Sequence, residues 1–420
     1  MKTIVTFLGT KPTLTRYSYN GKVFEGEVFA KALLQFLEFD RMLVFSTPEA
    51  HEKTWPVLEV LGDERIHEIP ISISARREDI WALFDVVIDQ VGEGETVVFD
   101  ITHGLRSIPF LAFLFAAYLK TAKQVNIEAI FYGAFELGDA SKGIPAPVID
   151  LSEYVTMLDW IVATDQFVNT GNARRLSDLL ARPGKEHKAS NAAANQLRKV
   201  SQAAFLVQPF TLMREADQLG AALDQAVEDF SVTARPFKVL SEKIVSSYVP
   251  LSAGDWASEK EKLVAQFMMI EWYRQRGQLI QALTLAREWL VDAVTVRLGL
   301  PVDYRRTPRG TMDRAVTGLG KVGGKIRDEE TDEFRDFTPS DLNEYGRKIY
   351  NDWPEKTTIG SLANTLSEVR NQLNHAEHQA NPFKLDTIQK KAEKALETLA
   401  DLAQSWGFSA ISQTKSDTQS

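Results

Sequence analysis

The sequence of 420 residues contains no cysteine. This excludes disulfide bonds, zinc sites built on thiolates and a thiol nucleophile, and it fits the cytoplasmic location that we expect. Long apolar runs are also missing. The longest, residues 108–119, is shorter than the ~20 residues that a membrane-spanning helix needs, and no secretory signal pattern follows Met1. We therefore expect a soluble protein with no membrane partner.

Basic residues are outnumbered, because 48 lysines and arginines stand against 57 acidic residues, a net charge of −9. That balance argues against a surface for long duplex DNA, but it allows local patches that bind a short RNA. Residues 300–327 are one such patch, with seven basic residues, two aspartates and five glycines. We expect a flexible basic loop here, which either attracts RNA phosphates or is an ordinary solvated loop.

The first 150 residues alternate between strand-like and helix-like patterns. This alternation predicts right-handed βαβ units, a parallel sheet and helices on both of its faces. The expected strands are 3–9, 42–46, 66–71, 96–101 and 126–133, and the expected helices are 24–39, 50–61, 77–91 and 105–121.

Almost everything after residue 151 has a helical pattern, and the glycine- and proline-containing stretch 138–147 marks the boundary. The predicted fold class is therefore α/β followed by all-α. We divide the chain into an α/β domain (1–150), a connecting helical domain (151–255), a second helical domain (256–408) and a small, polar, disordered tail (409–420).

Polar residues cluster where two of the predicted strands end. Ligands of parallel α/β sheets bind beyond the carboxyl ends of the strands, so these segments are expected to converge on one crevice. Hydroxyl, imidazole, guanidinium and backbone N–H groups suit phosphates or nucleotides. We expect Asp100 to be a structural cap and Gly104 to permit a tight turn. The predicted ligand-binding residues are Gly9, Thr10, Thr102, His103, Gly104, Arg106 and Ser107.

A second group of polar residues lies on a predicted helix, 361–379, in which apolar residues recur at spacings of three and four. On that helix Asn371 is about 40° and Arg370 about 140° from His375. One helix cannot easily focus Arg370 and His375 on one atom, whereas two copies related by a twofold axis can. Histidine suits proton transfer and arginine suits phosphate oxygens, which is the chemistry that RNA cleavage without a metal needs, and Asn371 would orient either group. Taken alone, an arginine and a histidine at this spacing are more often ordinary surface residues. His378 has metal-compatible spacing from His375 but no completing carboxylate, so we predict no metal site.

The Asp100-x-Thr102-His103-Gly104 signature resembles the "DxTHG" family of CRISPR-associated proteins. Three further segments are similar to that family: residues 4–10, residues 160–172, and 370–375, which fits the Arg-x-x-x-x-His motif of HEPN ribonucleases. The resemblance implies a Rossmann-like CARF domain that binds cyclic oligoadenylate and a HEPN ribonuclease domain with a composite dimeric site.

The function implied by this resemblance is an endoribonuclease that cuts single-stranded RNA non-specifically and leaves a 2′,3′-cyclic phosphate. It would need no cofactor, work as a homodimer or higher oligomer, and respond to cyclic oligoadenylate made by a type III CRISPR effector complex. Two alternatives remain open. One is a non-catalytic, ligand-sensing regulator that binds nucleic acid, with a helix-turn-helix in 173–235; the other is a ring nuclease that degrades cyclic oligoadenylate.

Overall fold

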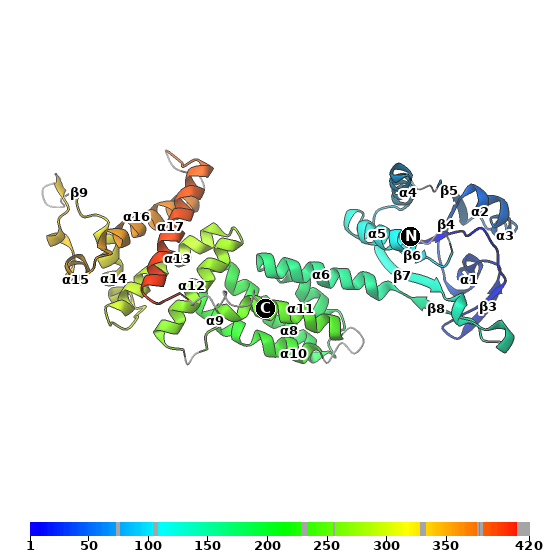
Figure 1. Cartoon of the computed structure of the whole chain (residues 1–420), viewed down its shortest axis with the longest axis horizontal. Helices are drawn as coiled ribbons and strands as arrows, with labels where there is room; N and C mark the ends of the chain where they lie inside the picture. The colour runs from blue at the N-terminus through cyan, green and yellow to red at the C-terminus, as the bar shows by residue number, and fades with distance from the viewer. Residues whose placement is uncertain are drawn as a thin grey trace, which may run out of the picture. The chain divides into compact units, whose positions relative to one another are not determined.

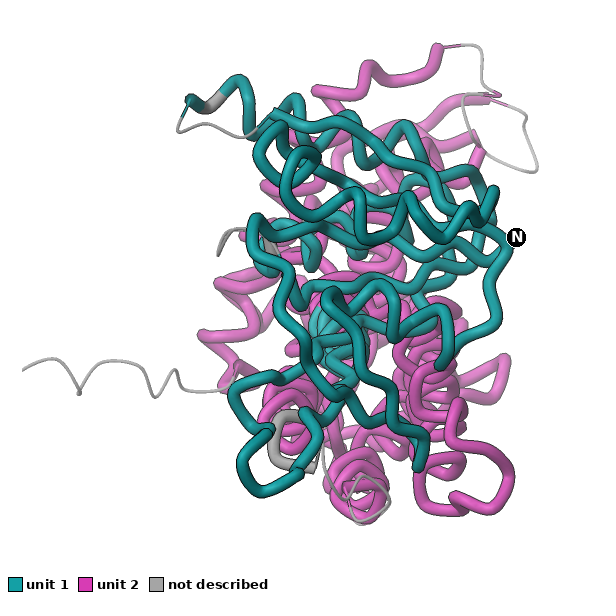
Figure 2. Tube along the Cα trace, turned by 90° about the vertical axis from the view of Figure 1, so that its right-hand side faces the viewer, with its two compact units in different colours: residues 1–161 teal, residues 162–420 magenta. Residues whose placement is uncertain are grey.

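The computed structural model describes residues 1–72, 76–103, 108–227, 234–254, 257–327, 333–375, 378 and 381–409. The chain divides into two compact units, which Figure 2 colours separately. Unit 1 comprises residues 1–161 and unit 2 comprises residues 162–420. Among the described helices, none has the length and apolar character that crossing a bilayer requires.

Unit 1 is built on a sheet of eight strands in the order β3-β2-β8-β7-β6-β1-β4-β5 (Figure 1). The five strands from β7 to β5 are mutually parallel. The strands are β1 (Lys2–Phe7), β2 (Thr15–Tyr19), β3 (Lys22–Gly26), β4 (Arg41–Ser46), β5 (Ile66–Pro70), β6 (Thr96–Asp100), β7 (Asn126–Gly133) and β8 (Ala146–Asp150). The predicted parallel α/β domain is confirmed.

Helices cover both faces of this sheet, because successive side chains of a strand point to opposite faces. Val5 and Phe7 of β1 belong to one apolar core with the helices α4 (Arg77–Gln90) and α5 (Ile108–Ala122). Ile4 belongs to the other core. The helices on that side are α1 (Phe29–Phe36), α2 (Pro48–Lys53) and α3 (Pro56–Glu59).

Three strands were not predicted from the sequence. β2 and β3 form an antiparallel hairpin whose turn is Asn20-Gly21, with φ of 48° and 77°, the pair that a two-residue hairpin turn favours. β8 runs antiparallel to β7 and links the hairpin to the sheet. The stretch expected to mark a boundary, 138–147, therefore contributes its last two residues to the sheet, and the chain leaves the sheet after Asp150.

The rest of the described chain is mainly helical, as predicted. The helices are α6 (Ser152–Thr170), α7 (Arg174–Ala181), α8 (Lys188–Phe205), α9 (Pro209–Asp217), α10 (Leu219–Val227), α11 (Ala234–Tyr248), α12 (Glu259–Gln275), α13 (Leu279–Arg297), α14 (Arg306–Leu319), α15 (Glu344–Asp352), α16 (Lys356–Asn374) and α17 (Leu385–Ser405). The short 3-10 turns are Phe135–Leu137, Ala140–Lys142, Val249–Leu251 and Pro339–Asp341. Helices α13, α16 and α17 pack together (Figure 1).

The prediction of a flexible loop at residues 300–327 is wrong, because half of this segment forms the helix α14. Its glycines and threonines obscured an amphipathic pattern in which Met312, Ala315, Val316 and Leu319 are buried. Packing of these apolar side chains overrides the poor helix propensity of their neighbours. After α14, β9 (Lys325–Arg327) pairs with β10 (Phe334–Asp336).

Candidate functional site

The two polar segments of unit 1 meet at the switch point of the sheet. Strands β1 and β6 are neighbours, and Thr6 stands opposite Asp100 in their register. β4 and β5 lie on one side of β1, whereas β6 and β7 lie on the other. The turn Gly9-Thr10 and the pair Thr102-His103 therefore leave the same carboxyl edge, where α/β sheets bind ligands.

Asp100 fixes the end of β6. Its side chain is fully buried, with Oδ2 accepting the Thr6 hydroxyl at 2.6 Å and Oδ1 accepting the backbone N–H of Thr102 at 2.8 Å. Burial raises the pKa of Asp100, although the nearby His103 and these hydrogen bonds lower it. These described contacts stabilise the loop after β6, whereas the helix start that Asp100 is predicted to cap lies outside the described residues.

Thr102 and His103 tie this loop to two other elements. The Thr102 hydroxyl is buried and accepts the backbone N–H of Gly133 in β7 at 2.8 Å. Nε2 of His103 accepts the backbone N–H of Phe29, the first residue of α1, at 3.2 Å. Burial lowers the pKa of His103, which favours the neutral ring that such an acceptor requires. Both groups thus shape the loop through contacts that the sequence did not reveal.

Of the other predicted ligand-binding residues, the structure describes two and leaves three undescribed. The carbonyl oxygen of Gly9 accepts the hydroxyl of Thr54 at 2.8 Å, and Thr10 is half-buried beside it. Gly104, Arg106 and Ser107 lie outside the described residues.

The candidate catalytic residues lie at the C-terminal end of α16. This helix ends at Asn374, earlier than the predicted residue 379, and His375 is its C-cap. The N–H of His375 still donates to the carbonyl of Asn371 at 3.0 Å, so helical geometry holds through His375. The separation of about 140° between Arg370 and His375 therefore applies.

The environments of these side chains differ. His375 and Asn371 are exposed, whereas Arg370 is half-buried. Nε of Arg370 is buried and has no hydrogen-bond partner in the part of the chain that the structure describes. A buried donor without a partner carries a free-energy cost.

The position of α16 depends on a close contact between two glycines. A Cβ atom on Gly360 would lie 2.6 Å from the backbone N of Gly320, and one on Gly320 would lie 2.5 Å from the carbonyl oxygen of Gly360. Only glycine at both positions permits this approach of α16 to the end of α14. The helix that carries Arg370 and His375 is thus seated by backbone contact.

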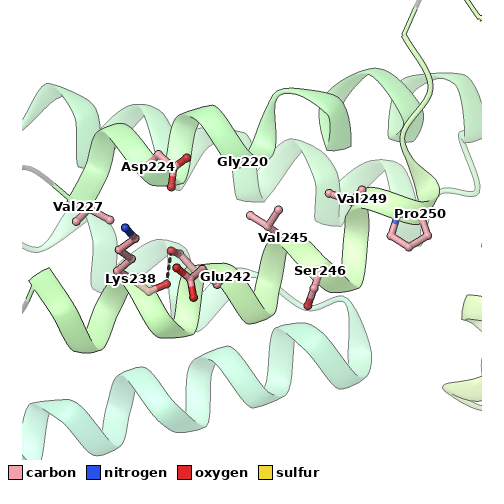
Figure 3. Close-up of a pocket in the computed structure, with 10 residues that line it drawn as sticks. Gly220, Asp224, Val227, Lys238, Glu242, Val245, Ser246, Val249 and Pro250 are labelled. Carbon is pink, nitrogen blue, oxygen red and sulfur yellow. Dashed lines mark hydrogen bonds between the residues drawn. The ribbon is translucent and has the colours of Figure 1, made fainter. Parts of the chain in front are cut away.

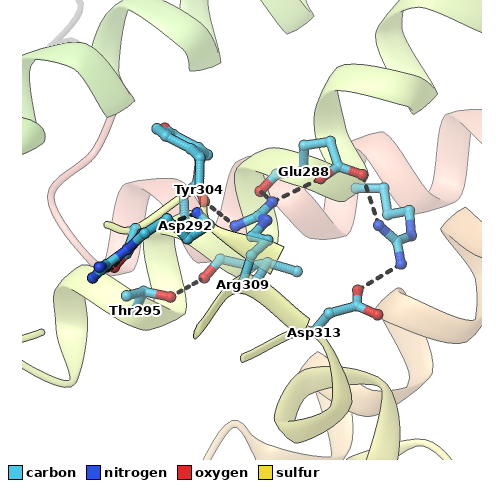
Figure 4. A network of polar contacts seen from close by, with 10 residues as sticks. Glu288, Asp292, Thr295, Tyr304, Arg309 and Asp313 are labelled. Atoms are coloured by element: carbon cyan, nitrogen blue, oxygen red, sulfur yellow. Dashed lines mark hydrogen bonds and ion pairs between the residues drawn. The ribbon is translucent and has the colours of Figure 1, made fainter. Parts of the chain in front are cut away.

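A partly buried network of polar and charged groups joins α13 to α14 (Figure 4). Arg309 donates to Oε2 of Glu288 at 2.7 Å and also to Asp292. The Tyr304 hydroxyl donates to Asp292 at 3.2 Å. Burial raises the pKa of Asp292 to about 6, although Arg309 and Tyr304 lower it. Arg309, expected in a flexible basic loop, is therefore a structural counter-ion.

Two hollows lie between helices of unit 2. One, of about 730 Å³, lies between α10 and α11 (Figure 3). Its floor includes Val245 and its rim carries Asp224, Lys238 and Glu242, but it contains no predicted site residue. The other, of about 480 Å³, lies between α16 and α17.

A mainly parallel sheet with polar groups at its switch point, followed by a helical unit, defines the class of the fold as an α/β domain joined to an all-α region. Within that second part, residues 156–249 match the family model described as the second domain of CRISPR-associated protein MJ1674. The CRISPR-associated protein MJ1674 of Methanocaldococcus jannaschii is 33% identical over 132 residues, which are 30% of this chain and 19% of that protein. Residues 156–249 are therefore similar to a domain of a CRISPR-associated protein, the class of protein that the sequence motifs resemble.

The match spans about a fifth of the length of that curated relative. The region that matches the family model, 156–249, includes residues 160–172, one of the segments on which the resemblance was based. Among solved structures, the Csm6 protein of Enterococcus italicus bound to cyclic hexa-2′-fluoro-hexa-dAMP has a TM-score of 0.43 and 11% identity, covering 98% of this chain and 96% of that one.

Proposed function

We propose that this protein is an endoribonuclease that cuts single-stranded RNA with little sequence selectivity and without a metal ion. Cyclic oligoadenylate made by a type III CRISPR effector complex would switch it on. The observation that carries the proposal is the end of α16. There an exposed histidine, His375, follows Arg370, whose buried Nε has no partner in the described part of the chain.

The chemistry follows from the residue types. A base must take the proton of a ribose 2′-OH, an acid must protonate the leaving 5′-oxygen, and cations must stabilise the phosphorane between them. His375 would move the protons, Arg370 would bind the phosphate oxygens, and Asn371 would orient either group. The 5′ fragment would end in a 2′,3′-cyclic phosphate.

Two copies of the chain would complete the site. Arg370 and His375 lie on different sides of one helix, so a twofold axis that brings two α16 helices together would place an arginine of one copy beside a histidine of the other. A homodimer is the smallest assembly that meets this requirement, and higher oligomers are compatible with it.

Activation would begin at the switch point of unit 1. A cyclic oligonucleotide has rotational symmetry, so each subunit of a dimer would read half of the ring. The binding site would be formed by Gly9, Thr10, Thr102, His103, Gly104, Arg106 and Ser107. The ligand would favour the active arrangement by its differential affinity, and the coupling between the two sites would be reciprocal.

The test is cleavage of a fluorescent single-stranded RNA in EDTA, with a panel of cyclic oligoadenylates. His375→Ala should abolish cutting and leave activator binding intact, whereas His378→Ala, three residues further on, should retain cutting. Cleavage by the His375→Ala variant would remove His375 from the mechanism. Activator-dependent binding of nucleic acid without cleavage by the wild type would instead support a non-catalytic regulator.

A further inference from the structure

We propose that the groove between α16 and α17 binds the phosphate backbone of single-stranded RNA and leads it toward His375. This inference rests on the proposed function and adds a binding track to the candidate catalytic end of α16. The groove has a volume of about 480 Å³. It is lined by Thr357, Thr358, Ser361, Leu362, Thr365, Lys391, Lys394, Ala395 and Thr398.

The lining has the chemistry of a phosphate-binding surface. Five of the nine residues carry hydroxyls, two are lysines, and none of these described lining residues is acidic. That composition reverses the balance of a chain with a net charge of −9. Lys394 is exposed and has no ion-pair partner among the described residues. Its ammonium group is therefore available for a phosphate.

The groove opens on the side of α16 that carries the histidine. Ser361 and His375 are fourteen residues apart, so they differ by about 40° around the helix and by about 21 Å along it. Arg370, in contrast, is about 180° from Ser361. A strand of RNA that follows the groove toward the end of α16 would therefore reach His375 of the same chain. The arginine that meets it would come from another copy.

Another hollow adjoins the groove between α16 and α17. Its volume is about 360 Å³, and it shares Thr357 and Ser361 with the groove. Tyr350 and Lys356 line it as well, with Nζ of Lys356 4.4 Å from the centre of the Tyr350 ring. Sites for single-stranded nucleic acid combine a cationic groove with aromatic rings on which bases stack. This hollow adds an aromatic ring and a cation beside the groove, with Nζ of Lys356 also donating to the carbonyl oxygen of Tyr350 at 2.7 Å.

Glu368 stands between the groove and the histidine. It lies about 20° from Ser361 around the helix, and its Oε2 is 2.7 Å from Nζ of Lys391. The carboxylate thus holds one lysine and adds a negative charge to the path of the RNA. Removing that charge should strengthen RNA binding, whereas removing the lysines should weaken it.

The experiment measures binding of a fluorescent oligouridylate to the full chain carrying His375→Ala, over a series of salt concentrations. In that background, K391A/K394A should weaken binding and make the slope of log K against log salt shallower by at least about 0.7, the value for one lost phosphate contact. Glu368→Gln should tighten binding. The control K185A/K188A, which removes the same charge from exposed positions at the start of α8, should leave the slope unchanged.

An unchanged slope in K391A/K394A overturns the track. If that variant fails to fold, Lys394→Ala alone should still reduce the slope by about 0.7. Loss of self-association in light scattering with unchanged RNA affinity also overturns it and assigns the groove to a contact between copies. The proposed function fails separately: a wild-type chain that binds RNA through the groove and never cuts it ends the nuclease proposal alone.

Discussion

Nε2 of His103 accepts the backbone N–H of Phe29 at 3.2 Å, so a histidine of the loop after β6 caps the first turn of α1. The N-cap residue itself, Val28, offers no side-chain hydrogen bond to this helix. This hydrogen bond therefore connects the loop at the switch point to a helix on one face of the sheet. A ligand that displaces His103 would also release the start of α1.

We predict that His103→Ala lowers the stability of the chain by about 1 kcal/mol, the usual effect of removing a helix cap. The effect should depend on pH. Because burial lowers the pKa of His103, its contribution is present above the unfolded value of about 6.5 and is lost as pH falls. Urea unfolding should show the difference between wild type and His103→Ala narrowing in acid. A difference that grows in acid would contradict the cap.

Substitution by alanine should lower the stability of unit 2 at Gly360 and raise it at Gly310. Gly360→Ala places a methyl group against the backbone of Leu319 and Gly320, and overpacking of this kind costs about 1–3 kcal/mol. Gly310 is also helical, but a Cβ there would meet only the side chain of Arg314, at 3.7 Å. Gly310→Ala should therefore stabilise by up to about 1 kcal/mol. Thermal unfolding of both variants checks the pair; equal effects would refute the glycine contact.

The periodic parts of this fold could be predicted from the sequence. Leu362, Leu366 and Val369 recur at helical spacing and are buried in α16. The apolar strands β1 and β6 likewise placed Gly9-Thr10 and Thr102-His103 at one edge of the sheet. In each case the signal is local, because burial of one face imposes its period on the sequence.

The contacts between distant segments could not be predicted. Thr102 contacts Gly133 and His103 contacts Phe29, 31 and 74 residues away. Arg309, in a segment expected to be a loop, finds its acidic partners in α13. Polar residue types indicate which chemistry is available, but the partner that each one takes depends on the tertiary structure.

The network around Asp292 should make the stability of unit 2 depend on pH. Burial raises the pKa of Asp292 from 3.8 to about 6, so its contribution is complete below the unfolded value and is lost as pH rises through about 6. Relative to Asp292→Asn, the wild type should lose about 2 kcal/mol between about pH 4 and about pH 7. Urea unfolding followed by tryptophan fluorescence measures this, since Trp289 is buried in the same helix. A pH-independent difference would show that Arg309 compensates for burial fully.

Mixing two inactive variants can test whether Arg370 of one copy and His375 of another act in the same site. Arg370→Ala and His375→Ala should each be inactive alone, because each lacks one of the two groups that the reaction needs. In a mixed dimer, one site would combine the intact histidine of the first chain with the intact arginine of the second. We therefore expect the mixture to regain RNA cleavage after the two proteins are unfolded and refolded together. If it stays inactive although mass spectrometry detects mixed dimers, Arg370 and His375 do not act across the twofold axis.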